Sequence, residues 1–328
     1  MKALRLAAAQ QFEWTDIAEP RSPAPGETLV SVRAIGICGT DVSGYLGKMP
    51  FIEFPRILGH ELGVEVIEIG SGVTHLKPGD RCSVEPYLNC GHCHACKQGR
   101  TNCCETLEVL GVHRDGGMCE RLLLPANKLH RSEKLTLEQL ALVETLAIGC
   151  HAVNRSVVTA HEDVLIIGAG PIGLAVLEFA RLATNRVAVL ELNDSRREFV
   201  KRNYPGVILP SHMPPDCFAQ VVFDATGSPA SMSQTLRFAK FTGRIVFVGI
   251  TKEPVTIDDP LLHRRELTLL ASRNAVATDF TRIIDLIETG RIDTLPWISH
   301  RAKFDSVPSA FPTWVQPSSG VIKAMVEM

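Results

Sequence analysis

The chain has 328 residues, 45% of them hydrophobic, and a formal net charge of -2 at pH 7. This length can bury two cores of ordinary size, and the small net charge gives no broad positive field for nucleic acid or an anionic membrane. The apolar run at the N-terminus is short, and no later apolar stretch reaches the roughly 18 residues of a membrane span. We therefore expect a cytoplasmic, two-domain protein that binds a small molecule.

Short β-rich runs alternate with Gly and Pro throughout residues 1–150. The runs at 28–34, 63–69 and 81–86 predict strands of an all-β domain with loops.

Three separated segments of this first half offer metal-binding side chains: Cys38, the pair His60 and Glu61, and Glu144. A thiolate, an imidazole and carboxylates, with one position left open for water or substrate, are what a catalytic zinc site requires. Taken singly, Cys38 is more typical of a small buried side chain, and the pair at 60–61 of a satisfied polar pair in a turn. Spacing alone therefore leaves the catalytic site open.

Four cysteines are spaced as C-x2-C-x2-C-x7-C in a loop rich in Gly, His and Asn: Cys90, Cys93, Cys96 and Cys104. Four thiolates at this spacing can close a tetrahedron around Zn2+, and such a closed site stabilises the fold rather than catalysing a reaction. Unligated surface thiols are the alternative, but so dense a cluster would oxidise easily. We predict a structural zinc, with His92, His94 and Cys103 outside the ligand set.

From about residue 162 the pattern changes to alternating strands and helices. This alternation predicts a parallel, doubly wound α/β sheet, and the tail from Arg291, which loses it, is expected to return to the first domain. The predicted strands are 164–167, 186–190, 221–225, 244–249 and 267–272, and the predicted helices are 171–184, 231–241 and 280–290.

A glycine-rich turn follows the apolar run at 164–167 and opens the next helix; it contains Gly168, Gly170, Pro171, Ile172 and Gly173. In this context the glycines permit a tight turn, close approach of a pyrophosphate and close packing of helix on strand. The helix N-terminus then faces the phosphates. Strand, turn and helix together predict a dinucleotide site.

Glu191 ends the next predicted strand. A carboxylate there can accept hydrogen bonds from the adenine ribose hydroxyls and repel a 2′-phosphate, which favours NAD over NADP. Arg196 and Arg197 oppose this prediction, because a nearby guanidinium could bind that phosphate if the loop turned inward. The alternative for these arginines is the exposed start of a helix.

In their order along the chain, these residues resemble the medium-chain zinc-dependent dehydrogenase/reductase superfamily over essentially the whole length. The resemblance implies a GroES-like β-barrel catalytic domain at 1–150 and 291–328 that carries both zinc sites. It also implies a Rossmann NAD-binding domain at 151–290 and assembly into a homodimer or homotetramer.

Within the superfamily the chain is most similar to the branch of polyol and sugar-acid dehydrogenases, which includes sorbitol, galactitol, threonine and L-galactonate or L-gulonate dehydrogenases. The likeness rests on Glu144, where classical alcohol dehydrogenases carry cysteine, and on Arg273 between Ser272 and Asn274. It implies Cys38 and His60 as zinc ligands, with Glu61 and Glu144 each a ligand or a water-bridged partner. The implied reaction is reversible hydride transfer from a secondary alcohol to NAD+, in which zinc lowers the pKa of the alcohol.

The same resemblance assigns further roles. Thr40 matches the hydroxyl that begins the proton relay, but Ser43 stands where relatives commonly have a histidine, and a serine cannot store a proton at neutral pH. Water or another histidine must then end the relay. Arg273 is expected near nicotinamide and substrate, where it binds a substrate carboxylate or else a cofactor phosphate or a partner subunit. The segments lining the cofactor site include Gly227, Val248, Gly249 and Ile250.

The chain departs from the family pattern in two places. Segment 203–220 is shorter than the usual connection, so one Rossmann element is expected to be trimmed, and Glu144 lacks the proline that commonly follows it. Neither departure removes a catalytic group. The alternatives are a zinc-dependent, NADP-linked aldehyde or alcohol reductase and, more remotely, a catalytically silent regulatory protein that binds metal and nucleotide.

Overall fold

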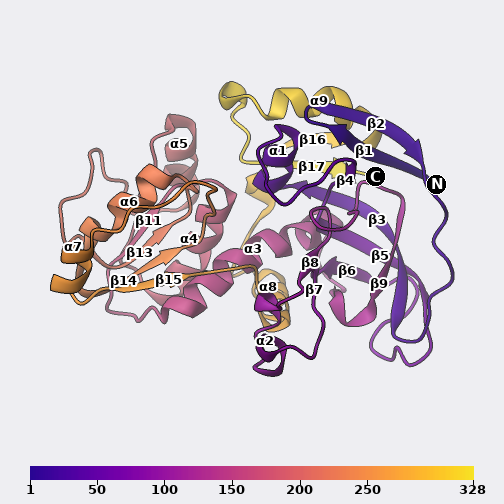
Figure 1. Ribbon diagram of the computed structural model, residues 1–328, viewed down its shortest axis with the longest axis horizontal. Helices are drawn as coiled ribbons and strands as arrows, with labels where there is room; N and C mark the ends of the chain where they lie inside the picture. The colour runs from indigo at the N-terminus through magenta and orange to yellow at the C-terminus, as the bar shows by residue number, and fades with distance from the viewer. The chain divides into compact units, whose positions relative to one another are not determined.

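The computed structural model describes residues 1–328, apart from the side chain of Pro317, and its contacts divide the chain into two compact units (Figure 1). The first unit combines Met1–Thr145 with Val276–Met328, and the second is Leu146–Ala275. Among the described residues, no helix is long and apolar enough to cross a membrane.

The first unit is built on a seven-stranded sheet in the order β10-β6-β5-β3-β17-β16, with β9 also paired to β3. Its neighbours are antiparallel except for β16 and β17, which run parallel. The strands are β3 (Glu27–Ile37), β5 (Glu61–Ile69), β6 (Arg81–Val84), β9 (Arg121–Pro125), β10 (Leu129–Arg131), β16 (Ile298–Lys303) and β17 (Lys323–Glu327).

Strand β3 crosses the centre of this sheet. Thr28, Val30 and Val32 alternate with more accessible residues, so the strand begins with one buried face. Its last four residues, 34–37, are all buried and pair with β17, and residues 34–36 also pair with β5. The tail therefore returns to the first unit, as the sequence predicts.

Smaller elements complete the first unit. A three-stranded sheet has the order β2-β1-β4, and β7 pairs with β8. These strands are β1 (Lys2–Ala8), β2 (Gln11–Asp16), β4 (Arg56–Ile57), β7 (Tyr87–Leu88) and β8 (Glu108–Val109). The helices are α1 (Gly39–Tyr45), α2 (His94–Lys97), α8 (Ala277–Glu288) and α9 (Val307–Trp314), with short 3-10 turns at Thr101–Cys103, Ala126–Lys128, Leu295–Trp297, Phe304–Ser306 and Pro317–Ser319.

Helix α3 (Leu137–Ser156) was not predicted, although it carries Glu144. Nearly every residue of 140–153 is buried, so the helix has no polar face and its sequence shows no amphipathic period. The boundary between the two units falls within this helix, between Thr145 and Leu146.

The second unit is a five-stranded parallel sheet in the order β12-β11-β13-β14-β15. The chain leaves β11 for β12 on one side and then returns to place β13 on the other, which creates a topological switch point beside β11. The predicted doubly wound sheet is confirmed. Its elements are β11 (Val164–Ile167), α4 (Pro171–Ala183), β12 (Val187–Leu190), α5 (Asp194–Asn203), β13 (Ala219–Asp224), α6 (Pro229–Phe238), β14 (Ala239–Phe247), α7 (Asp259–Arg264) and β15 (Thr268–Ala271).

The segment expected to lack one Rossmann element lies between α5 and β13. Between α5 and β13 the described residues form no helix or strand, and a single parallel bridge from Ala188 to Ile208 stands where an edge strand would extend the sheet. Another boundary is corrected: α6 ends at Phe238 and β14 begins at Ala239, because both residues pack into the core of the sheet.

The limit of the second unit differs from the domain boundary expected at residue 290. Helix α8 groups with the first unit, in which the ring of Phe280 stacks on His130 at 4.8 Å and Ser132 donates a hydrogen bond to Glu288 at 2.5 Å. These contacts pair residues distant in sequence, so alternation of strands and helices could not locate the boundary.

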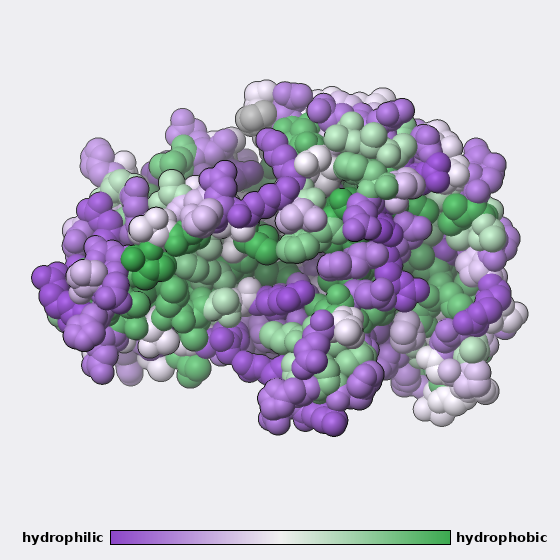
Figure 2. Space-filling model, in the orientation of Figure 1, coloured by the Kyte–Doolittle hydropathy of each residue, from purple (hydrophilic) through white to green (hydrophobic). Residues whose placement is uncertain are grey.

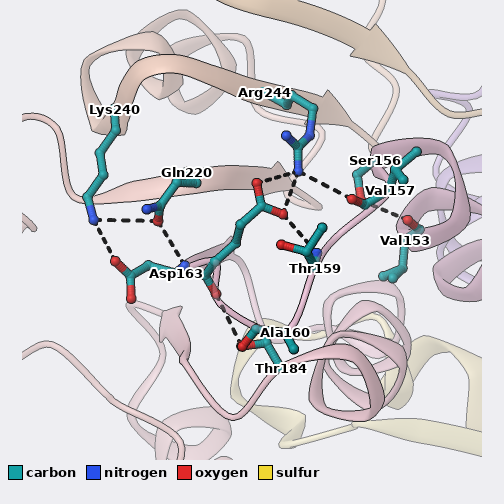
Figure 3. Close-up of polar contacts among 11 residues, drawn as sticks. Val153, Ser156, Val157, Thr159, Ala160, Asp163, Thr184, Gln220, Lys240 and Arg244 are labelled. Atoms are coloured by element: carbon teal, nitrogen blue, oxygen red, sulfur yellow. Dashed lines mark hydrogen bonds and ion pairs between the residues drawn. The ribbon is translucent and has the colours of Figure 1, made fainter.

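An ionic network ties together the amino-terminal ends of the parallel strands (Figure 3). Arg244 of β14 donates from Nη2 to both carboxylate oxygens of Glu162, at 2.8 and 2.7 Å, and Lys240 donates to Asp163 at 2.5 Å. In a parallel sheet this end lies opposite the carboxyl ends, where ligands bind. The network therefore stabilises the sheet away from the dinucleotide motif.

Candidate active site

The pairing of β3 with β5 brings the first three predicted ligands together. Cys38 directly follows β3 and caps α1, while His60 directly precedes β5 and Glu61 begins it, opposite Gly36. A sulfur of Cys38, a ring nitrogen of His60 and a carboxylate oxygen of Glu61 all lie within 4.8 Å of one another. Gly36 leaves room for the Glu61 carboxylate, since a Cβ there would overlap it and force Glu61 to move. This sulfur, nitrogen and oxygen donor set fits a zinc ion.

Glu61 is also held by a buried cation that the sequence analysis missed. The Lys323 ammonium donates to the two oxygens of Glu61 at 2.6 and 2.7 Å, to the Ile37 carbonyl at 3.3 Å and to the Thr145 hydroxyl at 3.2 Å. Lys323 is only 1% exposed; burial alone would lower its pKa, but Glu61 raises it, so the side chain stays charged. No sequence signal links Lys323 to a glutamate 262 residues earlier.

Glu144 lies on α3 and accepts a short hydrogen bond from the Tyr87 hydroxyl of β7. Burial raises the pKa of Glu144, although His60 opposes this shift, and burial together with Glu144 raises the pKa of Tyr87 well above its ordinary value. Tyr87 is therefore a stable hydrogen-bond donor. Glu144 lies within electrostatic reach of His60 but outside the close group of Cys38, His60 and Glu61.

Asp41 is a second residue that the sequence analysis missed. Its fully buried carboxylate accepts hydrogen bonds from the backbone N–H groups of Cys38 at 2.9 Å and Gly59 at 3.4 Å, and lies 3.7 Å from Nδ1 of His60. This distance is too long for a hydrogen bond, and Nδ1 of His60 is buried without a hydrogen-bond partner among the described residues. The available signal was an acidic residue three positions after the helix cap at Cys38.

Thr40 and Ser43 both lie on α1. Thr40 is half-buried in the first turn, two residues after Cys38, and Ser43 is half-buried one turn later.

The four predicted structural ligands also converge. The sulfurs of the four cysteines, Cys90, Cys93, Cys96 and Cys104, lie within 4.8 Å of one another. Backbone N–H groups of Cys93 and Cys90 donate to the sulfurs of Cys90 and Cys104, both at 3.3 Å. Burial opposes ionisation of Cys104, but its hydrogen bonds lower its pKa to about 6, whereas burial and the neighbouring thiols raise the pKa of Cys96 to about 11. Burial raises the pKa of the core residues Cys82 and Cys119 to about 12. The converging set fits Zn2+, whereas the core cysteines remain thiols.

The glycine-rich turn adopts the conformation that its sequence predicts. Gly168 has a φ of 94°, and a Cβ at Gly173 would overlap the Gly168 carbonyl, so helix α4 packs closely on the turn. Gly170 caps α4, Pro171 is its first residue and Ile172 its second. The N-terminus of α4 therefore lies at the carboxyl end of β11, at the switch point.

Glu191 follows β12 and binds this turn. Its carboxylate accepts hydrogen bonds from the backbone N–H groups of Ala169 at 2.7 Å, Leu192 at 2.7 Å and Asn193 at 2.8 Å. Arg197 donates to the carbonyls of Glu191 and Pro210 at 3.1 and 3.0 Å, so its guanidinium is engaged by the backbone. Arg196 lies 4.0 Å from the Glu191 carboxylate.

The loops after β13 and β14 lie beside each other at the same carboxyl edge of the sheet. They contain Gly227 and the segment Val248, Gly249 and Ile250, and a Cβ at Gly249 would overlap the backbone of Gly227. Asp224, which the sequence analysis missed, organises this edge: it accepts hydrogen bonds from the Thr226 hydroxyl at 2.6 Å and the Ser231 hydroxyl at 2.5 Å. Arg273 follows β15 by two residues.

Comparison with known proteins gives consistent matches. Residues 24–134 match the alcohol dehydrogenase GroES-like domain, and residues 171–289 match the zinc-binding dehydrogenase family. The chain is 36% identical to L-galactonate-5-dehydrogenase of Escherichia coli K12 over 316 residues, which cover 93% of each chain. Two solved structures match 100% of this chain and 99% of theirs: an alcohol dehydrogenase of E. coli CFT073 complexed with NADH (29% identity, TM-score 0.91) and a zinc-binding dehydrogenase of Sinorhizobium meliloti 1021 bound to NADP (31% identity, TM-score 0.89).

These matches confirm the predicted superfamily and the combination of a GroES-like domain with a Rossmann domain. They also support zinc and a nicotinamide cofactor. The chain therefore belongs to the zinc-dependent medium-chain dehydrogenase family and is an alcohol dehydrogenase that acts on CH–OH donors.

Proposed function

We propose that the protein oxidises a secondary alcohol of a sugar acid or polyol, with NAD+ as the hydride acceptor, and that it also catalyses the reverse reduction. The observation that carries this proposal is the convergence of Cys38, His60 and Glu61, with the buried carboxylate of Glu144 in electrostatic reach of His60. The similarity to L-galactonate-5-dehydrogenase, whose name specifies a sugar acid, supports the substrate class.

The proposal includes two zinc ions in each chain. Cys38 and His60 hold the catalytic ion, and Glu61 and Glu144 each act as a further ligand or as a partner bridged by water. The four-cysteine loop holds the structural ion. Catalytic zinc, when bound, supplies a Lewis acid that stabilises negative charge on the substrate oxygen. Asp41 places its carboxylate 3.7 Å from Nδ1 of His60, and Lys323 neutralises Glu61.

Thr40 is the proposed first acceptor of the substrate proton. It lies in the first turn of α1, two residues from Cys38, where a hydroxyl can pass a proton on but cannot keep it. Ser43, one turn later, cannot keep it either, so water or another histidine must end the relay.

NAD is the proposed cofactor because of the carboxylate of Glu191. This carboxylate directly follows β12 and accepts hydrogen bonds from three backbone N–H groups. It would place negative charge beside an adenine ribose and repel a 2′-phosphate. The NADP-bound relative favours the second candidate, an NADP-linked reductase in which Arg196 binds the phosphate.

Association into a homodimer or homotetramer is also part of the proposal. β15 is an edge strand of the five-stranded sheet, and three of its four residues, Thr268, Leu269 and Ala271, are exposed. Figure 2 shows apolar side chains gathered over β14 and β15 on the face in view. An exposed edge with apolar side chains favours pairing with another chain.

The first experiment combines metal analysis with a survey of substrates. We expect two zinc ions per chain and reduction of NAD+, followed at about 340 nm, with aldonates and polyols but not with simple primary alcohols. If Arg273 binds a substrate carboxylate, an aldonate should be preferred over its matching neutral polyol. A zinc-loaded protein that reduces neither NAD+ nor NADP+ with any of these substrates would refute the proposed function.

A second experiment tests the cofactor. Glu191→Ser removes the charge and most of the side chain, whereas Glu191→Gln keeps its length and removes only the charge. We expect both variants to improve kcat/KM with NADP+ relative to NAD+, because the repulsion of the 2′-phosphate is lost. Unaltered discrimination in both variants, or a wild type that already prefers NADP+, would favour the NADP-linked candidate.

A further inference from the structure

Tyr87 is not one of the predicted site residues, but its hydroxyl donates a hydrogen bond directly to Glu144. The Tyr87 hydroxyl donates to Oε1 of Glu144, and the two residues are 2% and 3% exposed. A hydrogen bond between groups so well excluded from water fixes the orientation of the carboxylate.

The tyrosine itself is rigidly placed. Its backbone belongs to β7, where it pairs with Val109 of β8, and its ring meets the ring of Phe280 edge to face at 6.3 Å. Two residues earlier, Glu85 accepts from Lys128 at 2.5 Å and lies 3.2 Å from His130, whose ring stacks on the same Phe280. The pairing of β7 with β8 and the contacts of Glu85 therefore hold in place the backbone from which the Tyr87 hydroxyl reaches Glu144.

The two glutamates at the site are held in different ways. Both oxygens of Glu61 accept hydrogen bonds from the Lys323 ammonium, so each oxygen of that carboxylate has a charged donor. Glu144 instead has a neutral donor on Oε1. An ionised carboxylate has lone pairs on both oxygens, so Oε2 keeps its capacity to bind a metal or a metal-site ligand.

We propose that Tyr87 is a positioning residue of the catalytic metal site: its hydroxyl donates to Oε1 of Glu144 and thereby fixes the carboxylate that we assign to that site together with Cys38 and His60. This inference rests on the proposed function, in which Glu144 acts at that site. Tyr87 touches neither substrate nor metal in this role, and acts through Glu144.

Tyr87→Phe tests the inference, because it removes the hydroxyl and keeps the ring against Phe280. Tyr204→Phe is a matched control: it removes a buried tyrosine–glutamate hydrogen bond of 2.8 Å, from Tyr204 to Glu178, in the second unit. We expect Tyr87→Phe to lose catalytic zinc to a chelator about 10- to 100-fold more readily than wild type, as for other groups that orient metal ligands, and Tyr204→Phe to retain it. Zinc held by the four cysteines should be unchanged in both variants, which also checks that they are folded.

Cobalt substitution and a double-mutant cycle give readouts that loss of stability alone would not change. The visible spectrum of Co2+ at the catalytic site should shift in Tyr87→Phe and not in Tyr204→Phe. In a Glu144→Ala background, Tyr87→Phe should cause no further loss of catalytic metal, because the two residues act as one unit.

Equal metal retention and equal cobalt spectra in the two tyrosine variants would overturn the inference, and so would an undiminished effect of Tyr87→Phe in the Glu144→Ala background. Failure of the proposed function looks different: wild-type protein would hold no zinc that Cys38→Ser removes, or would reduce no nicotinamide cofactor.

Discussion

Replacing Glu162 by Gln tests how strongly the ionic network in Figure 3 stabilises the second unit. The Glu162 carboxylate accepts two hydrogen bonds from Arg244, at 2.8 and 2.7 Å, and one from the backbone N–H of Thr159 at 2.8 Å. The side chains of Glu162 and Arg244 are 16% and 26% exposed, so water screens the pair only in part. Gln keeps the shape and one acceptor but removes the charge.

A hydrogen bond to a charged group contributes about 1.5–3 kcal/mol, and a neutral amide restores part of this. We therefore expect Glu162→Gln to lower the free energy of unfolding by about 1–2 kcal/mol at neutral pH. Glu198→Gln serves as the control, since Glu198 meets Lys201 at 3.8 Å with both side chains 72% exposed. An exposed pair of this kind should change stability by less than about 0.5 kcal/mol.

The pH dependence gives the sign of the effect. Burial alone would raise the pKa of Glu162, but the hydrogen bonds from Arg244 and Thr159 lower it below its ordinary value. A group whose pKa is lowered in the folded protein adds stability that is complete above its unfolded pKa, near 4.3, and is lost as the pH falls through the folded value. Urea unfolding followed by circular dichroism should show a constant deficit in Glu162→Gln from neutral pH to about 5, and a shrinking one below. A deficit no larger than that of Glu198→Gln, or one that grows on acidification, would refute this reasoning.

Three further predictions concern the metal sites. Thr40→Val should reduce turnover on the order of tenfold or more, and unchanged turnover with an unchanged pH profile would exclude Thr40 from the relay. Cys93→Ser should reduce the zinc content from two ions per chain to one and lower the melting temperature, which metal analysis and calorimetry can check; two retained ions would contradict the assignment. Lys323→Met should cost about 3–5 kcal/mol of unfolding free energy, since it leaves Glu61 buried without its cation, and wild-type stability in chemical denaturation would contradict that role.

Local patterns predicted the five strands and the glycine-rich turn of the second unit, but not helices α5 and α7. The run Val164–Ile167 is buried throughout and is followed directly by a turn in which the close packing of the chain requires glycine. The predicted bounds of this strand agree with those observed. The four-cysteine loop is likewise local, because 15 consecutive residues, 90–104, contain all its ligands. Such features depend on neighbours in sequence, which a single chain displays directly.

The elements that were missed depend on contacts between distant residues. Helix α3 is buried on all sides, so it has no polar face to reveal its period, and α8 joins the first unit through Phe280 and Glu288. Tyr87 and Glu144 are 57 positions apart in the sequence, and no pattern in the residues around Tyr87 predicts their contact. The family resemblance predicted the metal ligands, but not the residues that contact them.

The charges around Cys38 show why those supporting residues matter. Glu61, Glu144 and Asp41 are all at most 3% exposed, and Lys323 compensates one of them directly. Burial raises the pKa of both Asp41 and Glu144, and the neighbouring His60 opposes this shift in each. A divalent cation bound by Cys38, His60 and Glu61 would add further positive charge beside these carboxyls. Each acidic residue is visible in the sequence, but their burial together beside Lys323 and His60 exists only in the folded protein.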